Sequence, residues 1–516
     1  MGTIRFILRE FTPEDVQRVS SLICRNLREI NCHDYPPKII EQLVQEHTPE
    51  RILRMSTEGK TFLADVAGNP AGILRVLPSW NVSAEYWLRT VFVLPDYHGC
   101  GIGRQLVEAG ERFIQQQGGF SVRLCASRTA HLFYQRLGYC DLEKFAFFSR
   151  AALSSLPVIG FQPDVVHCHD WQTGLIPVYL KDSFQGGPFY QGIKTVMTIH
   201  NLKFQGTWDI KTIRELTGLP AYYFTPDKLE AYKDANLLKG GLVYADAITT
   251  VSNTYAEEIK TEFYGEHLDG LLRARAHDLR GIVNGIDYEE YNPETDTFLA
   301  KNYNAKNFRK EKVKNKLALQ KELGLQEDPK VMMIGVVSRL TDQKGFDLVN
   351  YVMDELCQDS IQLVVLGTGE ERYENMFRHF AWKYQGKVSA NIFYDNGLSH
   401  RIYASCDAFL MPSLFEPCGL SQLMSLRYGT LPIVRETGGL KDTVQPYNEY
   451  ESTGTGFSFT NYNAHEMLGT IRYAESVYYD KKREWNKLVD RAMAKDFSWA
   501  SSAKQYEEMY SWLIGG

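Results

Sequence analysis

Two basic residues, Arg339 and Lys344, lie five positions apart just after a run of apolar, mostly β-branched residues. A guanidinium and an ammonium at this spacing suit the clamping of a diphosphate leaving group, whose growing negative charge they would stabilise. Taken alone, such a pair usually belongs to a solvated loop. Motifs at corresponding places elsewhere in the chain decide whether it belongs to a site.

Polar side chains follow two earlier apolar runs. Asp170 and Trp171 come directly after the first, and His200 and Asn201 directly after the second. Two later runs end in an acid or in glycine-rich strings, Phe-Glu-Pro-Cys-Gly-Leu and Glu-Thr-Gly-Gly-Leu. Because open α/β sheets bind ligands at the carboxyl ends of their strands, these loops together predict one site.

Each residue also has a simpler explanation when considered alone. His200 would more often be a satisfied core residue, and Glu416 could be an acid at a helix N-terminus. The cationic helix at 310–321 reads as a solvated face. The order of the loops along one sheet edge is what favours a functional site.

The elements that must position these loops lie after residue 143, where continuous apolar runs alternate with amphipathic helices. This pattern is typical of parallel strands covered on both faces, so two doubly wound domains are predicted. The predicted strands are 165–167, 195–199, 247–251, 281–283, 331–337, 361–366, 388–393, 408–412 and 431–434.

The first part of the chain predicts a separate mixed α/β domain, and lysine usage marks the border: only Lys38 and Lys60 precede residue 143. Its predicted strands are 3–8, 61–66, 71–77, 85–93 and 121–126, and its predicted helices are 12–26, 38–45, 103–117 and 130–137.

Glycines at 99, 101 and 103 follow a predicted strand and open a predicted helix. Such a turn could let backbone N–H groups converge on a phosphate, although glycine-rich turns more often only supply positive φ angles. A second signal is the short helix at 130–137, which carries the phenol of Tyr134.

In this order and separation, the two signals resemble the GNAT acetyltransferases, over residues 1 to about 140. The resemblance implies acetyl-CoA as cofactor, an unidentified acetyl acceptor, and Tyr134 as the acid that protonates the departing thiolate. Glu85 is a candidate base. The implied acetyl-CoA-binding residues are His98, Gly99, Gly101, Ile102 and Gly103. His98 stands where the family has Arg or Gln, and a neutral imidazole adds little charge against a pyrophosphate.

The strings after residue 143 resemble the bacterial glycogen and starch synthases, over about 145–513 with the motif spacing preserved. The resemblance implies a retaining GT-B glycosyltransferase, built from two Rossmann-like domains. It would move glucose from ADP-glucose to the 4-hydroxyl of glycogen or another α-1,4-glucan, without metal or cofactor.

The resemblance also implies a role for each motif residue. Arg339 and Lys344 would hold the ADP diphosphate. Glu416 would fix the glucose through its hydroxyls, and His200 would sit near the anomeric carbon. The other implied substrate-binding residues are Asp170, Trp171, Asn201, Tyr394 (on the adenine), Cys418, Gly419, Leu420, Thr437, Gly438 and Gly439.

One motif of that family is missing from the sequence. In the family a Lys-x-Gly-Gly-Leu loop brings a lysine to the donor phosphates, whereas the Gly-Gly pair at 118–119 here has no lysine before it. We therefore expect the first Rossmann-like domain to be incomplete and its sheet edge to be exposed. Three explanations stay open: a fusion whose first domain covers the gap, a fusion that binds ADP or glucan with little catalysis, and an accidental joining of two genes.

The expected layout is a GNAT-like domain at 1–142, a partial acceptor-side Rossmann-like domain at 143–285, an ADP-glucose-binding Rossmann-like domain at 286–496, and a returning helix at 497–516. The fold class is α/β throughout.

Composition limits the other possibilities. The 516 residues are 44% hydrophobic and 23% charged, as in ordinary globular proteins, and the net charge of −6 argues against nucleic acid as a partner. Nine cysteines form no metal-spaced cluster, and no apolar run approaches membrane-spanning length. We expect a cytoplasmic protein without a metal or a membrane anchor.

Overall fold

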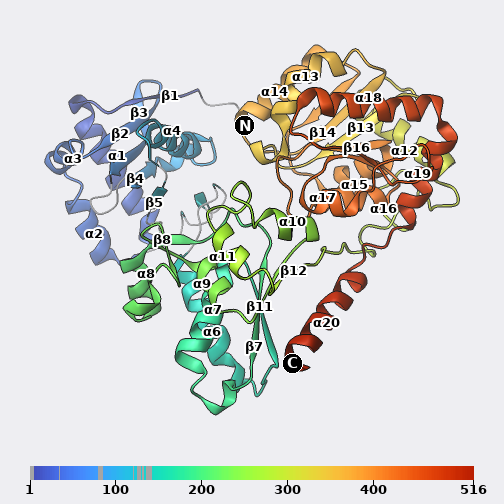
Figure 1. Ribbon diagram of the computed structural model, residues 1–516. Helices are drawn as coiled ribbons and strands as arrows, with labels where there is room; N and C mark the ends of the chain where they lie inside the picture. The colour runs from blue at the N-terminus through green and yellow to red at the C-terminus, as the bar shows by residue number, and fades with distance from the viewer. Residues whose placement is uncertain are drawn as a thin grey trace. The chain divides into compact units, whose positions relative to one another are not determined.

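The computed structural model describes residues 5–33, 35–78, 85–119, 121–124, 130, 133–134, 137 and 142–515. The chain divides into two compact units, Met1–Asp141 and Leu142–Gly516. Each unit has its own sheet structure (Figure 1). Each also has its own apolar core. The α/β fold class expected from the sequence is confirmed in both.

The first unit is built on one five-stranded sheet in the order β1-β2-β3-β4-β5, antiparallel except for the parallel pair β4 and β5. Its elements are β1 (Ile7–Glu10), α1 (Val16–Glu29), α2 (Pro37–Gln45), α3 (Pro49–Met55), β2 (Lys60–Val66), β3 (Asn69–Pro78), β4 (Glu85–Val93), α4 (Ile102–Gln116) and β5 (Ser121–Leu124).

Alternation along the strands gives this sheet two apolar faces. Leu63 and Ile73 pack with the core residues of α1, whereas Ala64 and Leu74 pack with Leu106 of α4. Side chains of successive strand residues point to opposite faces, so one sheet holds helices on both sides.

A β-bulge interrupts β4 near its carboxyl end. Ile73 pairs with Phe92 and Arg75 pairs with Arg89, so three steps on β4 oppose two on β3. Thr90, inside the bulge, has a φ of +52°. Bulges bend a strand and re-aim its side chains, here just before the residues that lead into α4.

The second unit begins with a four-stranded parallel sheet in the order β12-β11-β7-β6. On one face, Met197 and Ile199 pack with α6, α7 and α9. On the other face, Val196 packs with Met509 and Leu513 of α20, the helix at the end of the chain (Figure 1). Among the strands that the structure describes, β6 pairs only with β7 and forms an edge of this sheet.

The elements of this part are α6 (Leu142–Val158), β6 (Val165–His169), α7 (Leu175–Tyr179), β7 (Lys194–Ile199), β8 (Thr207–Asp209), α8 (Ile210–Thr217), β9 (Glu230–Ala231), β10 (Asp234–Asn236), α9 (Leu237–Tyr244), β11 (Ala247–Thr250), α10 (Asn253–Glu258), α11 (Asp269–Ala274), β12 (Leu279–Gly281) and α20 (Trp499–Gly515). Strands β8, β10 and β9 form a small antiparallel sheet that the sequence patterns did not predict.

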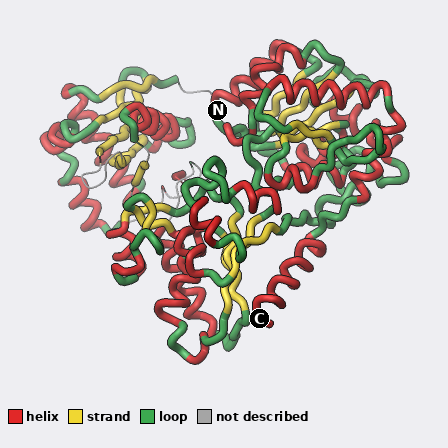
Figure 2. The backbone as a smooth tube through the Cα atoms, in the orientation of Figure 1, coloured by secondary structure: helices red, strands yellow, loops and turns green. Residues whose placement is uncertain are grey.

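A six-stranded parallel sheet follows, in the order β15-β14-β13-β16-β17-β18. The chain runs outward from β13 to β15, then returns to β16 beside β13 and runs outward the other way. The gap between β13 and β16 is therefore a topological switch point, where open α/β sheets bind their ligands. Figure 2 shows the strands of this sheet enclosed by helices.

The elements of this part are α12 (Phe308–Glu322), β13 (Met332–Val337), α13 (Phe346–Leu356), β14 (Ile361–Leu366), α14 (Glu371–Lys383), β15 (Val388–Asn391), α15 (Asn396–Ser405), β16 (Ala408–Met411), α16 (Ser421–Arg427), β17 (Leu431–Arg435), α17 (Gly438–Thr443), β18 (Phe457–Phe459), α18 (Ala464–Asp480) and α19 (Lys482–Ala494).

Most predicted elements have a counterpart within two residues. The strand predicted at 281–283 lies at Leu279–Gly281 instead, and the first predicted helix is a 3₁₀ turn followed by α1. Half of the residues of the helix predicted at 130–137 fall outside the described residues. In the described part of the chain, none of the helices combines the length and the apolar character needed to cross a bilayer.

Candidate functional site

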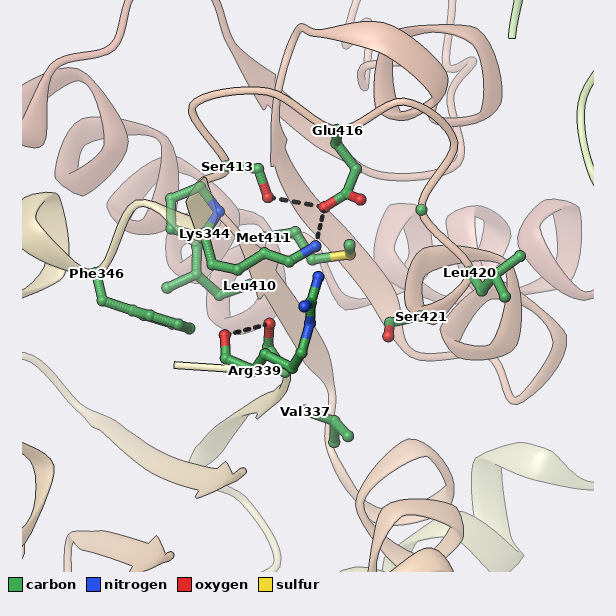
Figure 3. A pocket seen from close by; sticks show the side chains of 13 residues that line it. Val337, Arg339, Lys344, Phe346, Leu410, Met411, Ser413, Glu416, Leu420 and Ser421 are labelled. Carbon is green, nitrogen blue, oxygen red and sulfur yellow. Dashed lines mark hydrogen bonds and ion pairs between the residues drawn. The ribbon is translucent and has the colours of Figure 1, made fainter. Parts of the chain in front are cut away.

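A cavity of about 180 Å³ opens at the switch point of the six-stranded sheet. Arg339 and Lys344 reach it from the segment after β13, and Ser413 and Glu416 from the segment after β16 (Figure 3). The structure thus brings together the two cations and the acid, although Lys344 and Glu416 lie 72 residues apart in the sequence.

Lys344 and Glu416 form a buried ion pair in this cavity. The Lys344 Nζ lies 2.6 Å from Glu416 Oε2, and the two side chains are only 15% and 7% exposed. Ser413 Oγ donates to the same carboxylate oxygen at 3.1 Å. Figure 3 shows the Arg339 guanidinium extending toward this pair. Two cations against one carboxylate leave a net positive pocket, which suits an anionic ligand.

A glycine allows Lys344 to take its place. Gly345 has a φ of +74°, and a Cβ there would lie 2.0 Å from the carbonyl oxygen of Pro412. The segments after β13 and β16 can approach closely only because position 345 has no side chain.

The Cys418 to Leu420 segment borders the same cavity. Gly419 and Leu420 line it, and Gly419 has a φ of +70°. Cys418 is buried, and burial raises the pKa of its thiol to about 12. A neutral thiol in that position contributes packing rather than charge.

The glycine-rich loop before α17 makes contacts that the sequence did not suggest. The Gly438 amide donates to both carboxylate oxygens of Glu258, at 3.0 and 3.1 Å, and Thr437 Oγ1 donates to Glu258 Oε1 at 2.8 Å. The Gly439 amide donates to the carbonyl oxygens of Glu416 and Pro417, both at 3.1 Å. In this arrangement the protein's own oxygens accept both amides.

Glu258 comes from α10, on the first sheet of the unit, and was not singled out in the sequence. Burial raises the pKa of its carboxyl, while the Gly438 amide and the Thr437 hydroxyl lower it. In the sequence Glu258 is an acid that follows the strand at 247–251. A solvated acid on a helix would give the same pattern, so the sequence did not point to it.

Further contacts join the loops of the two sheets. Ser252 Oγ donates to the carbonyl oxygen of Pro417 at 2.6 Å, and the Thr254 amide donates to Asp442 Oδ2 at 2.9 Å. These bonds fix the end of β11 beside the segment that carries Glu416.

The residues after β6 and β7 form a second polar cluster. Asp170 has a φ of +55°, and its Oδ1 accepts the His200 amide at 2.8 Å, which ties the two loops together. His169 Nδ1 lies 3.0 Å from His200 Nε2. Asn201 Oδ1 accepts the amide of Lys203 at 3.1 Å and so shapes its own turn.

Histidine 167 connects this cluster to α20. Its Nδ1 lies 2.6 Å from the Tyr510 hydroxyl, its Nε2 lies 2.6 Å from Thr198 Oγ1, and its ring stacks on His169 at 4.3 Å. Burial, with the like charge of neighbouring histidines, lowers the pKa of His167 to about 3 and lowers that of His169. Both rings are therefore neutral at pH 7.

Two predicted substrate contacts lie elsewhere. Trp171 is 4% exposed and packs against Phe145 and Gly206, as a core residue does. Tyr394 is 88% exposed on the loop before α15, where its ring is open to a stacking partner. Neither borders the cavity at the switch point.

The first unit has its own cavity, of about 430 Å³, bordered by the glycine turn and by Tyr134. Gly99 and Gly101 have φ angles of +76° and +84°, and Gly101 precedes the first turn of α4. A Cβ at Gly103 would lie 3.2 Å from the Phe133 ring. Ile102 and Gly103 begin the helix whose first amides have no intrahelical acceptor.

The His98 side chain forms a hydrogen bond with the backbone of its own unit. Its Nε2 donates to the carbonyl oxygen of Val93 at 2.8 Å. The Nε2 donor is therefore occupied by the backbone and is not available to a phosphate.

Tyr134 is 7% exposed in the core of the first unit, and burial raises its pKa to about 12. Its phenol therefore keeps its proton at neutral pH. The Glu85 backbone begins β4, and its side chain lies outside the described residues. In the part of the chain that the structure describes, no three His, Cys, Asp or Glu side chains converge as a metal site would require.

Comparison with known proteins finds family matches in both units. Residues 106–274 match the starch synthase catalytic domain model, residues 315–487 match the glycosyl transferases group 1 model, and residues 57–141 match the acetyltransferase (GNAT) domain model.

Individual relatives agree. The glycogen synthase of Lachnospira eligens is 74% identical over 373 residues, which cover 72% of this chain and 78% of that protein. The glycogen synthase of Lachnoclostridium phytofermentans is 70% identical over 375 residues, covering 73% and 78%. The catalytic domain of starch synthase IV from Arabidopsis thaliana, bound to ADP and acarbose, superposes with a TM-score of 0.69 at 30% identity, covering 89% of this chain and 85% of that one.

Both resemblances drawn from the sequence motifs are thereby confirmed. The chain belongs to the glycogen synthase family of glycosyltransferases and carries a GNAT acetyltransferase domain at its N-terminal end.

Proposed function

We propose that the second unit transfers glucose from ADP-glucose to the 4-hydroxyl of an α-1,4-glucan, with retention at the anomeric carbon. The observation that carries this proposal is the cavity at the switch point, where Arg339, Lys344 and Glu416 converge. A relative with this architecture was solved with ADP and acarbose, a nucleotide and an oligosaccharide analogue.

The cations and the acid of the cavity have different roles in this transfer. When the bond between glucose and diphosphate breaks, negative charge grows on the leaving group, and the fixed cations Arg339 and Lys344 stabilise it. One N–H of the Lys344 ammonium already donates to Glu416, which leaves two for phosphate oxygens. Glu416 in turn accepts hydrogen bonds from sugar hydroxyls and holds Lys344 in place.

His200 contributes from the first sheet of the unit. Its amide is fixed by Asp170 and its ring by His169, so its orientation is set before substrate arrives. An imidazole held in this orientation can form a hydrogen bond with a sugar hydroxyl. Tyr394 offers an exposed ring for the adenine.

The direct test is incorporation of labelled glucose from ADP-glucose into glycogen by the full chain. Arg339→Ala is expected to lower the rate about 100-fold or more, because each tenfold is about 1.4 kcal/mol of lost transition-state stabilisation. Arg378→Ala, which removes a surface arginine on α14 paired with Glu374, is the matched control. Wild-type incorporation no higher than that of Arg339→Ala would contradict the proposal.

A second candidate is a protein that binds ADP or glucan without transferring glucose. It is favoured by two observations: the aligned region covers 78% of the Lachnospira relative, and the sequence has no Lys-x-Gly-Gly-Leu string. This candidate predicts saturable ADP binding that Arg339→Ala abolishes, with no label in glycogen.

For the first unit we propose acetyl transfer from acetyl-CoA, with the turn from His98 to Gly103 at the pyrophosphate and Tyr134 as general acid. The raised pKa of Tyr134 supports this role, because the phenol arrives protonated. Tyr134→Phe is expected to slow thiol release from acetyl-CoA with an amine acceptor panel while leaving acetyl-CoA affinity unchanged. Equal loss of affinity and rate would assign Tyr134 to packing instead.

The layout proposed with these activities is 1–142, 143–285, 286–496 and 497–516, as the sequence suggested. We also propose that the chain works in the cytoplasm, since all seven cysteines that the structure describes are free.

A further inference from the structure

A second cavity of the six-stranded domain, of about 310 Å³, is lined by an unusual number of basic side chains. Five of its lining residues are cations and one is an acid, Asp407; the cations are Arg309, Lys312, Lys316, Lys330 and Lys482. The chain as a whole has a net charge of −6, so this concentration of positive charge is local. We propose that the cavity is an anion site for a small molecule that carries one or two phosphate groups.

The cavity lies at the opposite edge of the sheet from the catalytic site. Lys330 precedes β13 and Asp407 precedes β16, whereas Arg339 and Glu416 follow those same strands. A six-residue strand spans roughly 20 Å, at about 3.3 Å per residue. A ligand here would leave the catalytic pocket free for its own substrate.

Two of the cations are built into the wall. Lys316 is 2% exposed; its ammonium pairs with Asp407 at 2.5 Å and donates to the Val331 carbonyl at 2.8 Å. The Lys312 ammonium has no carboxylate partner in the described structure, and donates instead to the Ala404 and Tyr428 carbonyls at 2.9 and 3.1 Å and to Thr430 Oγ1 at 2.9 Å. These bonds use its three N–H donors, so Lys312 acts on an anion through its charge alone. These two charges are fixed in position, and Asp407 neutralises only one of them.

The remaining cations stand at the rim and can reach a ligand. Lys482 is held with its Nζ 3.6 Å from the centre of the Tyr478 ring, and within the described part of the chain neither Lys482 nor Lys330 forms an ion pair. Arg309 is paired with Asp490. A third acid, Asp328, lies near Lys330 and accepts its backbone amide at 2.8 Å.

Counted as fully ionised, the five basic side chains exceed the three acids by two positive charges. Burial and the nearby Lys316 lower the pKa of Lys312 to about 7 and lower that of Lys482. Burial, more than the neighbouring lysine, thus disfavours the charged forms of Lys312 and Lys482, and a bound phosphate group would favour them. Tyr478 and Tyr479 add aromatic ring surface to the walls.

The first experiment maps the site by position, so that phosphate binding at the catalytic pocket does not interfere. Pyridoxal phosphate condenses with lysine amines to an aldimine and water, and borohydride reduction then fixes the adduct for peptide mass spectrometry. We expect Lys482 and Lys330 to be modified about fivefold more than the control lysines 310 and 321, with protection by inorganic pyrophosphate. Equal modification of all four, or no protection, would overturn the proposal.

The second experiment measures affinity. Pyrophosphate and a hexose phosphate are titrated separately into wild type, K330S/K482S, and the charge-matched control K310S/K321S, all in an R339A background. Loss of both rim cations is expected to weaken binding about tenfold, and the control less than about twofold. Tighter binding of the hexose phosphate would identify a sugar phosphate as the ligand, and tighter binding of pyrophosphate a bare diphosphate. Equal weakening by both double variants, or no saturable binding in the R339A parent, would contradict an anion site.

Discussion

The carboxylate of Glu258 accepts the amide hydrogen of Gly438, with the nitrogen 3.0 and 3.1 Å from its two oxygens. Glu258 lies on α10, which follows β11 of the four-stranded sheet, and Gly438 lies where the glycine-rich loop meets α17, beside Glu416. A single side chain of one sheet domain thus holds the backbone of the other at the edge of the catalytic cavity.

Glu258→Ala is expected to lower kcat for glucosyl transfer about tenfold, because the loop loses the contact that orients it and the Gly438 amide is left without its acceptor. Glu258→Gln keeps one acceptor oxygen and should lose less. Steady-state kinetics with ADP-glucose measures both, and Glu257→Ala, at an exposed neighbour paired with Lys260, is the control. An unchanged kcat in Glu258→Ala would show that the contact does not position the site.

Lys344 and Glu416 should be energetically coupled, since each leaves a buried unpaired charge when its partner is removed. We expect Lys344→Met and Glu416→Gln each to lower the free energy of unfolding, and the double variant to lower it by at least about 1 kcal/mol less than their sum. Chemical denaturation of the four proteins measures this coupling. Additive losses would mean that solvent screens the pair.

Gly345→Ala should destabilise the second unit more than an ordinary glycine substitution. Its Cβ would lie 2.0 Å from the Pro412 carbonyl, and φ is +74°. Gly324 has a similar φ of +66° with open space around it, so Gly324→Ala isolates the backbone strain, about 1 kcal/mol. Thermal unfolding should show a clearly larger loss at 345, and equal losses would count against the steric argument.

His98→Arg is expected to increase the affinity of the first unit for acetyl-CoA about three- to tenfold, because a guanidinium adds charged donors where the imidazole is bonded to Val93. Calorimetric titration with acetyl-CoA measures the change. His33→Arg, at an exposed position of the same unit, controls for net charge. Unchanged affinity would show that residue 98 does not face the pyrophosphate.

The stability of the second unit should fall on acidification because of His167. Its pKa is about 3 in the folded state against 6.5 in the unfolded chain, so the unfolded state binds the extra proton between these values. Stability is fully present above about pH 6.5 and is lost at up to about 1.4 kcal/mol per pH unit below it. The difference between the unfolding midpoints at pH 7 and pH 5 should be smaller in His167→Gln than in wild type. The surface control His379→Gln should keep the wild-type difference.

The local sequence predicted most of the fold because its signals are local. The apolar, β-branched run at 363–366 is typical of a strand covered on both faces, and β14 (Ile361–Leu366) contains it. The small sheet of β8, β9 and β10 could not be predicted in this way, because two- and three-residue strands carry no period and depend on tertiary contacts.

For the site, the sequence by itself determined which side chains are present and that Arg339, Lys344 and Glu416 follow strands of one sheet. It could not say that Glu258 occupies the Gly438 amide, that Trp171 is a core residue, or that His98 is bonded to Val93. It also read the cationic helix at 310–321 as a solvated face, although Lys312 and Lys316 of that helix line a cavity. Those outcomes were decided by the tertiary structure, because the partner of a polar group depends on which distant segments folding brings within about 3 Å of it.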